Sequence, residues 1–123
     1  MPRIIIPTVD ETGLDAEIAQ HFGRTPYFTM VDFNEDKKIS QVTTIPNKGE
    51  HFGGRSHAHD LLQSYHPDAV VVYGMGPRGL QSFQQAGIAV LKAHGNTTKD
   101  IVTAYFDNNL PELTTGCLQA HHK

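Results

Sequence analysis

The chain has 123 residues, of which 38% are hydrophobic and 19% are charged, and its formal net charge is −3. This composition is typical of one globular domain and excludes a chain dominated by disorder. Ten Lys and Arg residues against thirteen Asp and Glu residues give no overall positive field, which argues against bulk nucleic-acid binding. One cysteine excludes an internal disulfide, and no apolar run approaches the roughly 20 residues of a membrane span. We therefore expect a single domain over residues 1–123 that works in the cytoplasm.

The first half of the chain is predicted to form three strands. Residues 3–9 are a β-branched apolar run, the pattern of a strand buried on both faces. Residues 14–21 are weakly periodic and predict one or two helical turns. Residues 27–33 and 39–45 flank a polar turn, which predicts an antiparallel hairpin.

Helices and short strands are predicted to alternate in the second half. Ser56 is a candidate cap for a helix that ends near residue 65, and strands are predicted at 69–73 and 88–91. A second helix is predicted to begin at Pro77 and to stop at Gly87. Its inward-facing side chains are expected to be Leu80, Phe83 and Ala86.

A third helix is predicted to begin after Asn96 or Thr97. Thr97 and Asp100 have the spacing of a capping-box pair, and the tail from about residue 110 shows little periodicity. The apolar stripe of this helix is expected to be Ile101, Val102, Tyr105 and Phe106. The element order, a hairpin followed by crossover units, predicts an α/β fold with a mixed sheet.

A glycine-rich turn, residues 74–79, joins a predicted buried strand to a helix. Ligands of open α/β sheets settle at the carboxyl ends of strands, and Gly74 and Gly76 would let backbone N–H groups point at an anion. Arg78 adds positive charge near the same helix end. The alternative is a tight strand-to-helix turn without a ligand, and the motif is neither GxGxxG nor a P-loop.

Several of the eight histidines have spacings that suit a metal site. His51, His57 and His59 form one candidate set, because imidazole is the commonest metal-binding side chain. Cys117 and His121 are four residues apart and would share one face of a helical tail. In both cases the alternative is solvated histidines, with Cys117 as a small buried thiol.

The segment His21-Phe22-Gly23-Arg24 follows the first predicted helical turns. Gly23 permits a tight turn, Arg24 could pair with an anion, and Phe22 is expected in the core. No Ser, His and Asp set in the sequence has the spacing of a nucleophile with its base.

Three segments together resemble the dinitrogenase iron–molybdenum cofactor biosynthesis family, which includes carriers of nitrogenase cofactor and a member that holds a molybdenum–copper sulfide cluster. The segments are Ile-Ala-Gln-His-Phe-Gly-Arg-Thr-Pro-Tyr-Phe at 18–28, Gly-Met-Gly-Pro at 74–77 and Gly-Ile-Ala-Val at 87–90. The resemblance implies a ribonuclease-H-like three-layer fold, with a mixed, roughly five-stranded sheet and helices on both faces. It also implies binding of an anionic metal–sulfur cluster without catalysis.

The resemblance places the cluster groove between three loops. Its expected lining, beside His51, His57 and His59, is His21, Gly23, Arg24, Arg55, Gly74, Gly76 and Arg78. The partners would be proteins that deliver and receive the cofactor, and a homodimer is a further expectation. A plain zinc or nickel protein that uses the histidines and Cys117 without sulfide is the alternative function. A nuclease would need carboxylates on the central strands, and the first strand carries none.

Overall fold

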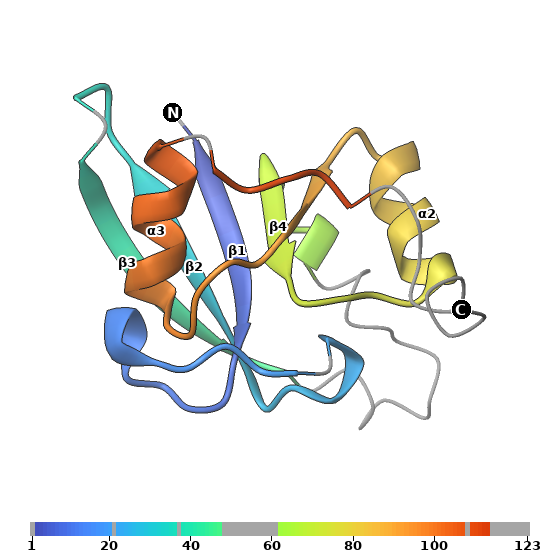
Figure 1. Cartoon of the computed structure of the whole chain (residues 1–123), viewed down its shortest axis with the longest axis horizontal. Coiled ribbons are helices and arrows are strands. Elements are labelled where there is room, and N and C mark those ends of the chain that lie inside the picture. The colour runs from blue at the N-terminus through green and yellow to red at the C-terminus, as the bar shows by residue number, and fades with distance from the viewer. Residues whose placement is uncertain (1, 21, 37, 48–61, 108, 114–123) are drawn as a thin grey trace.

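The computed structural model describes residues 2–20, 22–36, 38–47, 62–107 and 109–113. Their core is one five-stranded sheet in the order β3-β2-β1-β4-β5 (Figure 1). The three strands on one side are antiparallel, whereas β4 and β5 run parallel to β1, so the predicted mixed sheet is confirmed. The strands are β1 (Arg3–Thr8), β2 (Tyr27–Phe33), β3 (Ile39–Pro46), β4 (Ala69–Val72) and β5 (Ala89–Lys92).

Helices cover both faces of the sheet, as predicted. On one face, Ile5 and Val70 pack with Leu80 and Phe83 of α2 (Pro77–Gln85). On the other face, Ile4, Ile6 and Val71 pack with Ile101 and Val102 of α3 (Thr98–Phe106). The alternation along β1 decides this arrangement, because neighbouring side chains of a strand point to opposite faces. In Figure 1, α3 lies in front of the β1–β3 part of the sheet and α2 lies beyond β4.

The ends of α2 follow from local chemistry. Pro77 is the first helical residue, and the N–H groups of Gly87 and Ile88 donate to the carbonyls of Gln84 and Phe83. This pair of bonds, with Gly87 at φ +76°, is a Schellman ending. The prediction that Ala86 faces inward is wrong. Ala86 is the C-cap, and the chain turns away from the core there, which leaves its side chain exposed.

The predicted capping box of α3 is confirmed. The Thr97 hydroxyl accepts the Asp100 N–H, and the Asp100 carboxylate accepts the Thr97 N–H, both at 3.3 Å. Ile101 and Val102 are buried as predicted, whereas Phe106 is 38% exposed. The helix ends at Phe106, where its last ring lies at the rim of the core.

The helix predicted over residues 14–21 is wrong beyond its first turn. A single 3-10 turn, η1 (Gly13–Asp15), is followed by extended backbone that bridges two distant parts of the chain. Ile18 pairs with Thr8, and Glu17 pairs with Thr97, both antiparallel. These pairings are non-local, so the periodicity of the sequence carries no sign of them.

Two further segments bear on the predictions. Of the helix predicted from Ser56, only Leu62 and Gln63 are described as helical, and Ser56 itself lies outside the described residues. The predicted irregular tail begins with a segment that hydrogen-bonds to β5, through Lys92 N–H to Pro111 and Leu113 N–H to Val90. No helix in the described part of the chain has the length and apolar character to cross a membrane.

Candidate functional site

Segment 19–25, of which the structure describes residues 19, 20 and 22–25, is attached to the carboxyl end of β1. The Ala19 N–H donates to the Pro7 carbonyl at 2.9 Å, where this segment begins. Where it ends, the Thr25 hydroxyl lies 2.8 Å from the carbonyl oxygens of Thr8 and Tyr27. Thr25 is only 2% exposed, so these bonds are shielded from water. Both ends of the segment are thus fixed to the same edge of the sheet.

An aromatic contact holds the middle of this segment. Phe22, which opens the 3-10 turn η2 (Phe22–Arg24), is 8% exposed and packs against two other rings. Its ring centroid lies 5.4 Å from that of Phe28 and 5.8 Å from that of Phe83, the latter in an edge-to-face arrangement. The prediction that Phe22 is core is confirmed. Burying Phe22 leaves Arg24 exposed at the edge of the sheet.

Asn47 brings the end of β3 to the same corner. Its N–H donates to the Pro26 carbonyl at 3.0 Å, and its side-chain amide donates to the Thr25 carbonyl at 2.8 Å. The chain therefore leaves β3 beside the clamped segment 19–25. Sequence reasoning missed this role of Asn47, although an Asn beside Pro46 is a common turn signal.

The glycine turn ends in a helix N-terminus whose cap residue has no side chain. Gly76 is the N-cap of α2, and within the part of the chain that the structure describes no side-chain capping hydrogen bond is formed there. Pro77 has no N–H, so the first-turn donors are those of Arg78 and Gly79. Among the residues that the structure describes, a Cβ built on Gly76 would meet nothing within 4 Å. Backbone N–H groups, the helix dipole and the exposed Arg78 together favour an anion here.

The parallel pairing of β1 with β4 brings these two segments to one edge. Ile5 pairs with Val70, so the clamped segment after β1 and the glycine turn after β4 both leave the sheet at its carboxyl end. In Figure 1 this is the lower edge, along which residues 13–20 and 22–24 run. Of the predicted site residues, Gly23, Arg24, Gly74, Gly76 and Arg78 belong to these two segments.

The remaining predicted site residues lie outside the described residues. They are His21, His51, Arg55, His57, His59, Cys117 and His121. Among the residues that the structure does describe, no group of three His, Cys, Asp or Glu side chains could hold a metal ion. The histidine and Cys117 sites therefore stay predictions.

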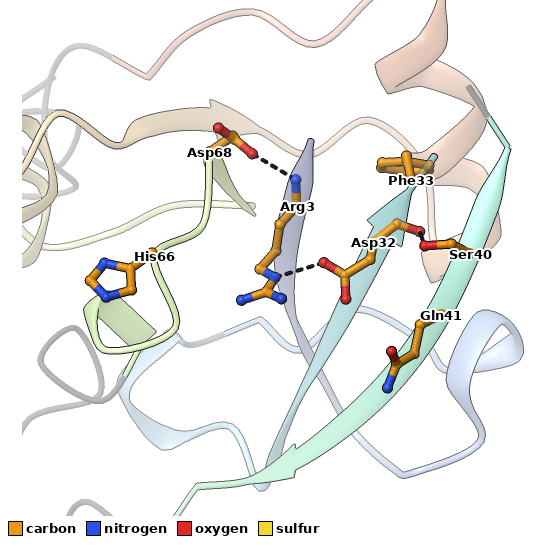
Figure 2. Close-up of a pocket in the computed structure, with 7 residues that line it drawn as sticks. All are labelled: Arg3, Asp32, Phe33, Ser40, Gln41, His66 and Asp68. Carbon is orange, nitrogen blue, oxygen red and sulfur yellow. Dashed lines mark hydrogen bonds and ion pairs between the residues drawn. The ribbon is translucent and has the colours of Figure 1, made fainter. Parts of the chain in front are cut away.

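A polar pocket of about 330 Å³ opens at the opposite edge of the sheet (Figure 2). Its central side chain is Arg3, whose Nε lies 2.6 Å from Asp32 Oδ1 and whose Nη1 donates to the Tyr65 carbonyl at 2.6 Å. The Arg3 N–H donates to Asp68 Oδ2 at 2.7 Å, and the Asp68 N–H donates back to the Arg3 carbonyl. These bonds join β1, β2 and the entry to β4, so the pocket is a structural junction.

His66 lies on the rim of this junction and away from the carboxyl edge. It is exposed, and its backbone is in the left-handed region with φ +55°. The conformation completes the turn between Leu62 and Pro67, where the Tyr65 and His66 N–H groups donate to the carbonyls of Leu62 and Gln63. His66 is therefore an exposed histidine outside the candidate site.

Comparison with known proteins decides the family. A family model described as dinitrogenase iron-molybdenum cofactor matches residues 3–108. The chain belongs to this family. The resemblance seen in the three sequence segments is thereby confirmed. A curated relative in this comparison, an uncharacterized protein of Methanocaldococcus jannaschii, is 28% identical over 99 residues, which cover 78% of this chain and 82% of the relative.

Solved structures of low identity share the fold of this dinitrogenase cofactor family member. The apo form of the orange protein from Desulfovibrio gigas superposes with a TM-score of 0.76 at 24% identity, covering 94% of this chain and 95% of that chain. A Thermotoga protein assigned to the DUF35 family superposes with a TM-score of 0.74 at 23% identity, covering 94% of this chain and 96% of that chain. At these identities the likeness concerns the fold alone.

Proposed function

We propose that the protein is a small non-catalytic carrier or scaffold that binds an anionic iron- or molybdenum–sulfur cluster, or its precursor. The observation that carries the proposal is the N-terminus of α2, where the N-cap is Gly76 and Arg78 is exposed, at the edge where segment 19–25 is also attached. Family membership, through the match over residues 3–108, supports the same class of cargo.

The chemistry of the cargo explains why these groups would hold it. A sulfide-rich cluster is large and negative, so it is stabilised by guanidinium groups and by backbone N–H donors. Arg24 and Arg78 supply the first, and the first turn of α2 supplies the second. Direct bonds to metal would come from imidazole or thiolate, which suit iron and copper. For these we propose the predicted ligands His21, His51, His57, His59, Cys117 and His121, with Arg55 as a further cation.

The fold supports a carrier better than a nuclease. The strand order is β3-β2-β1-β4-β5, and β2 runs antiparallel to the other four strands. This order is consistent with the ribonuclease-H-like arrangement that the resemblance implies. Two-metal hydrolysis needs several carboxylates that converge on the central strands. The central strand β1 has the sequence Arg-Ile-Ile-Ile-Pro-Thr and contributes no carboxylate. We therefore propose no catalytic residue for this chain.

The proposal also names a setting. A carrier needs one protein that delivers the cluster and one that receives it, and both would meet the carboxyl edge of the sheet. A homodimer would present two such edges. The single cysteine of the chain suits a reducing compartment such as the cytoplasm, where metal–sulfur clusters are assembled.

Anaerobic loading tests the proposal. The purified protein is incubated with iron, sulfide and tetrathiomolybdate, desalted, and analysed for metal, acid-labile sulfide and visible absorption. We expect stoichiometric metal with sulfide in the wild type, and lower retention in Arg24→Gln/Arg78→Gln. Arg3→Gln, which changes the same residue type at the opposite edge, is the matched control. A His57→Ala/His59→Ala variant should also retain less cluster, with unchanged far-UV circular dichroism.

One result would contradict the carrier function, and another would contradict the proposed location of the site. Stoichiometric zinc or nickel without any need for sulfide would favour the plain metal-binding alternative. If Arg24→Gln/Arg78→Gln and Arg3→Gln retain equal amounts of cluster, the cluster does not bind at the carboxyl edge.

A further inference from the structure

His94 leaves the sheet beside the glycine turn. The parallel pairing of β4 with β5 ends at Val72 and Lys92, and the Ala93 N–H extends it with a bond to the Val72 carbonyl at 2.6 Å. Continued two residues past the last pair, this register sets position 94 level with position 74. Ala93 is buried on the α3 side of the sheet. Continued one residue beyond Ala93, the alternation of β5 directs position 94 to the α2 side, where Phe22 and Met75 are buried.

The other flank of His94 is the approach to segment 19–25. The Ile18 N–H donates to the Asn96 carbonyl at 2.9 Å, and Glu17 bridges Thr97 in the antiparallel sense. In an antiparallel register, each step forward along one segment matches a step backward along the other. Moving from Ile18 to Gln20 therefore corresponds to moving from Asn96 back to His94. Continued to position 94, both registers lead toward the two segments that form the candidate site.

The loop that carries His94 is held in one conformation. The Tyr73 hydroxyl donates to the Gly95 carbonyl at 2.6 Å, and the Asp100 carboxylate accepts the Asn96 N–H at 3.1 Å. Gly95 has φ +132°, and a Cβ at this position would lie 2.6 Å from the Asp100 Cβ. His94 itself is exposed. An exposed side chain on a fixed loop is preorganised for a ligand, because little chain entropy is lost on binding.

We infer that the His94 imidazole is a metal ligand for the bound cluster, a role that rests on the proposed carrier function. Its nitrogen lone pair would replace water or another labile ligand on a terminal metal of the cluster. Imidazole is a common ligand for iron and for copper. One imidazole nitrogen would be enough to attach the cluster, because the cationic side chains of the protein would balance the negative charge of the sulfides. His94 would fix the orientation of the cluster between the glycine turn and segment 19–25.

The test compares two exposed histidines at opposite edges of the sheet, His94 and His66. Copper(I) and tetrathiomolybdate serve as the probe under anaerobic conditions, and retained molybdenum and copper are measured after desalting. Even the loss of a residue that only hydrogen-bonds to a metal ligand weakens metal binding roughly 10–100-fold. Loss of a direct ligand in His94→Ala should therefore weaken retention by about tenfold or more. His66→Ala should match the wild type. Added free imidazole should restore retention in His94→Ala, which a purely structural role would not allow.

A direct readout accompanies the variants. In protein labelled with ¹⁵N-histidine, the ring nitrogens of His94 should shift on loading, and those of His66 should not. If the wild type retains no cluster, the carrier proposal fails and this inference fails with it. If the wild type and His94→Ala retain equal amounts and the His94 nitrogens do not move, the carrier stands and this inference alone is overturned.

Discussion

The hydroxyl of Thr25 lies 2.8 Å from the carbonyl oxygen of Thr8, seventeen residues earlier in the chain. Thr8 is the last residue of β1, and Thr25 precedes β2 by two residues. One side chain therefore closes the loop between the two strands, with Asn47 bonded to the other side of Thr25. The position of segment 19–25, and of Arg24 within it, depends on this bond.

Thr25→Val should destabilise the protein while leaving its shape nearly unchanged. The substitution keeps the volume of the side chain but leaves a shielded carbonyl without its donor, which costs about 1–3 kcal/mol. We expect a matching fall in the free energy of unfolding, measured by urea denaturation. Thr103→Val is the control, because Thr103 is exposed on α3 and its hydroxyl donates to the Lys99 carbonyl of the same helix. Equal effects of the two substitutions would contradict the clamp.

Gly95→Ala should cost more stability than Gly87→Ala. Both glycines have positive φ, +132° and +76°, so both substitutions strain the backbone, typically by about 1–3 kcal/mol. Among the described residues, a new Cβ at Gly95 would also meet a neighbour, the Asp100 Cβ at 2.6 Å, whereas a Cβ at Gly87 would meet nothing within 4 Å. Thermal unfolding should therefore show the larger fall for Gly95→Ala. A larger fall for Gly87→Ala would show that the Gly95 loop is less constrained than its contacts indicate.

Acid should weaken the start of α3. Hydrogen bonds from the N–H groups of Asn96 and Thr97 hold the pKa of Asp100 below its ordinary value of 3.8. Because the folded-state pKa is the lower one, the stabilisation is complete above the unfolded-state pKa and is lost as the pH falls through the folded-state pKa. The stability difference between wild type and Asp100→Asn should be constant above about pH 5 and shrink below it.

An internal control separates this effect from general acid denaturation. The pKa of Asp10 is also lowered, by the Thr12 hydroxyl and N–H, in the loop after β1. Asp10→Asn should therefore remove only its own part of the acid dependence, and the difference due to Asp100 should persist in that background. A wild-type and Asp100→Asn difference that does not change with pH would refute the role of the carboxylate charge.

Arg3→Gln should affect stability, whereas Arg78→Gln should affect cluster loading. Arg3 holds Asp32 and the Tyr65 carbonyl together, so its loss should lower the free energy of unfolding by about 1 kcal/mol. Arg78 is exposed in the first turn of α2, so its loss should leave stability unchanged and reduce retention of the cluster. Urea denaturation and metal analysis of both variants check the pair. Loss of loading in Arg3→Gln at unchanged stability would point to the pocket of Figure 2.

The sequence was sufficient for the parts of the fold that depend on neighbouring residues. The β-branched run at the start predicted β1, and Thr97 with Asp100 predicted the beginning of α3. Pro77 and Gly87 predicted the two ends of α2. Each of these signals acts within about one helical turn or one strand, where side-chain chemistry and backbone conformation are directly linked.

Features built by distant pairs were missed. Glu17 and Ile18 were predicted helical, but their partners Thr97 and Thr8 draw them into extended bridges. The bond between Tyr73 and Gly95 likewise joins two loops that nothing in the local pattern connects. The candidate site could be located to three segments by resemblance, but the role of His94 between them depends on the register of β4 and β5.

The short pairing of the tail with β5 has a consequence for solubility. An uncovered edge strand offers its N–H and C=O groups to any other extended chain, and this is a common route to aggregation. In this protein, Pro111 and Leu113 occupy bonding positions along β5 at 2.7 Å each, and Leu110 is buried beneath them. A truncation before residue 110 would expose that edge. We expect such a chain to form sheet-like aggregates on expression, even though it would still contain all five strands and both α2 and α3.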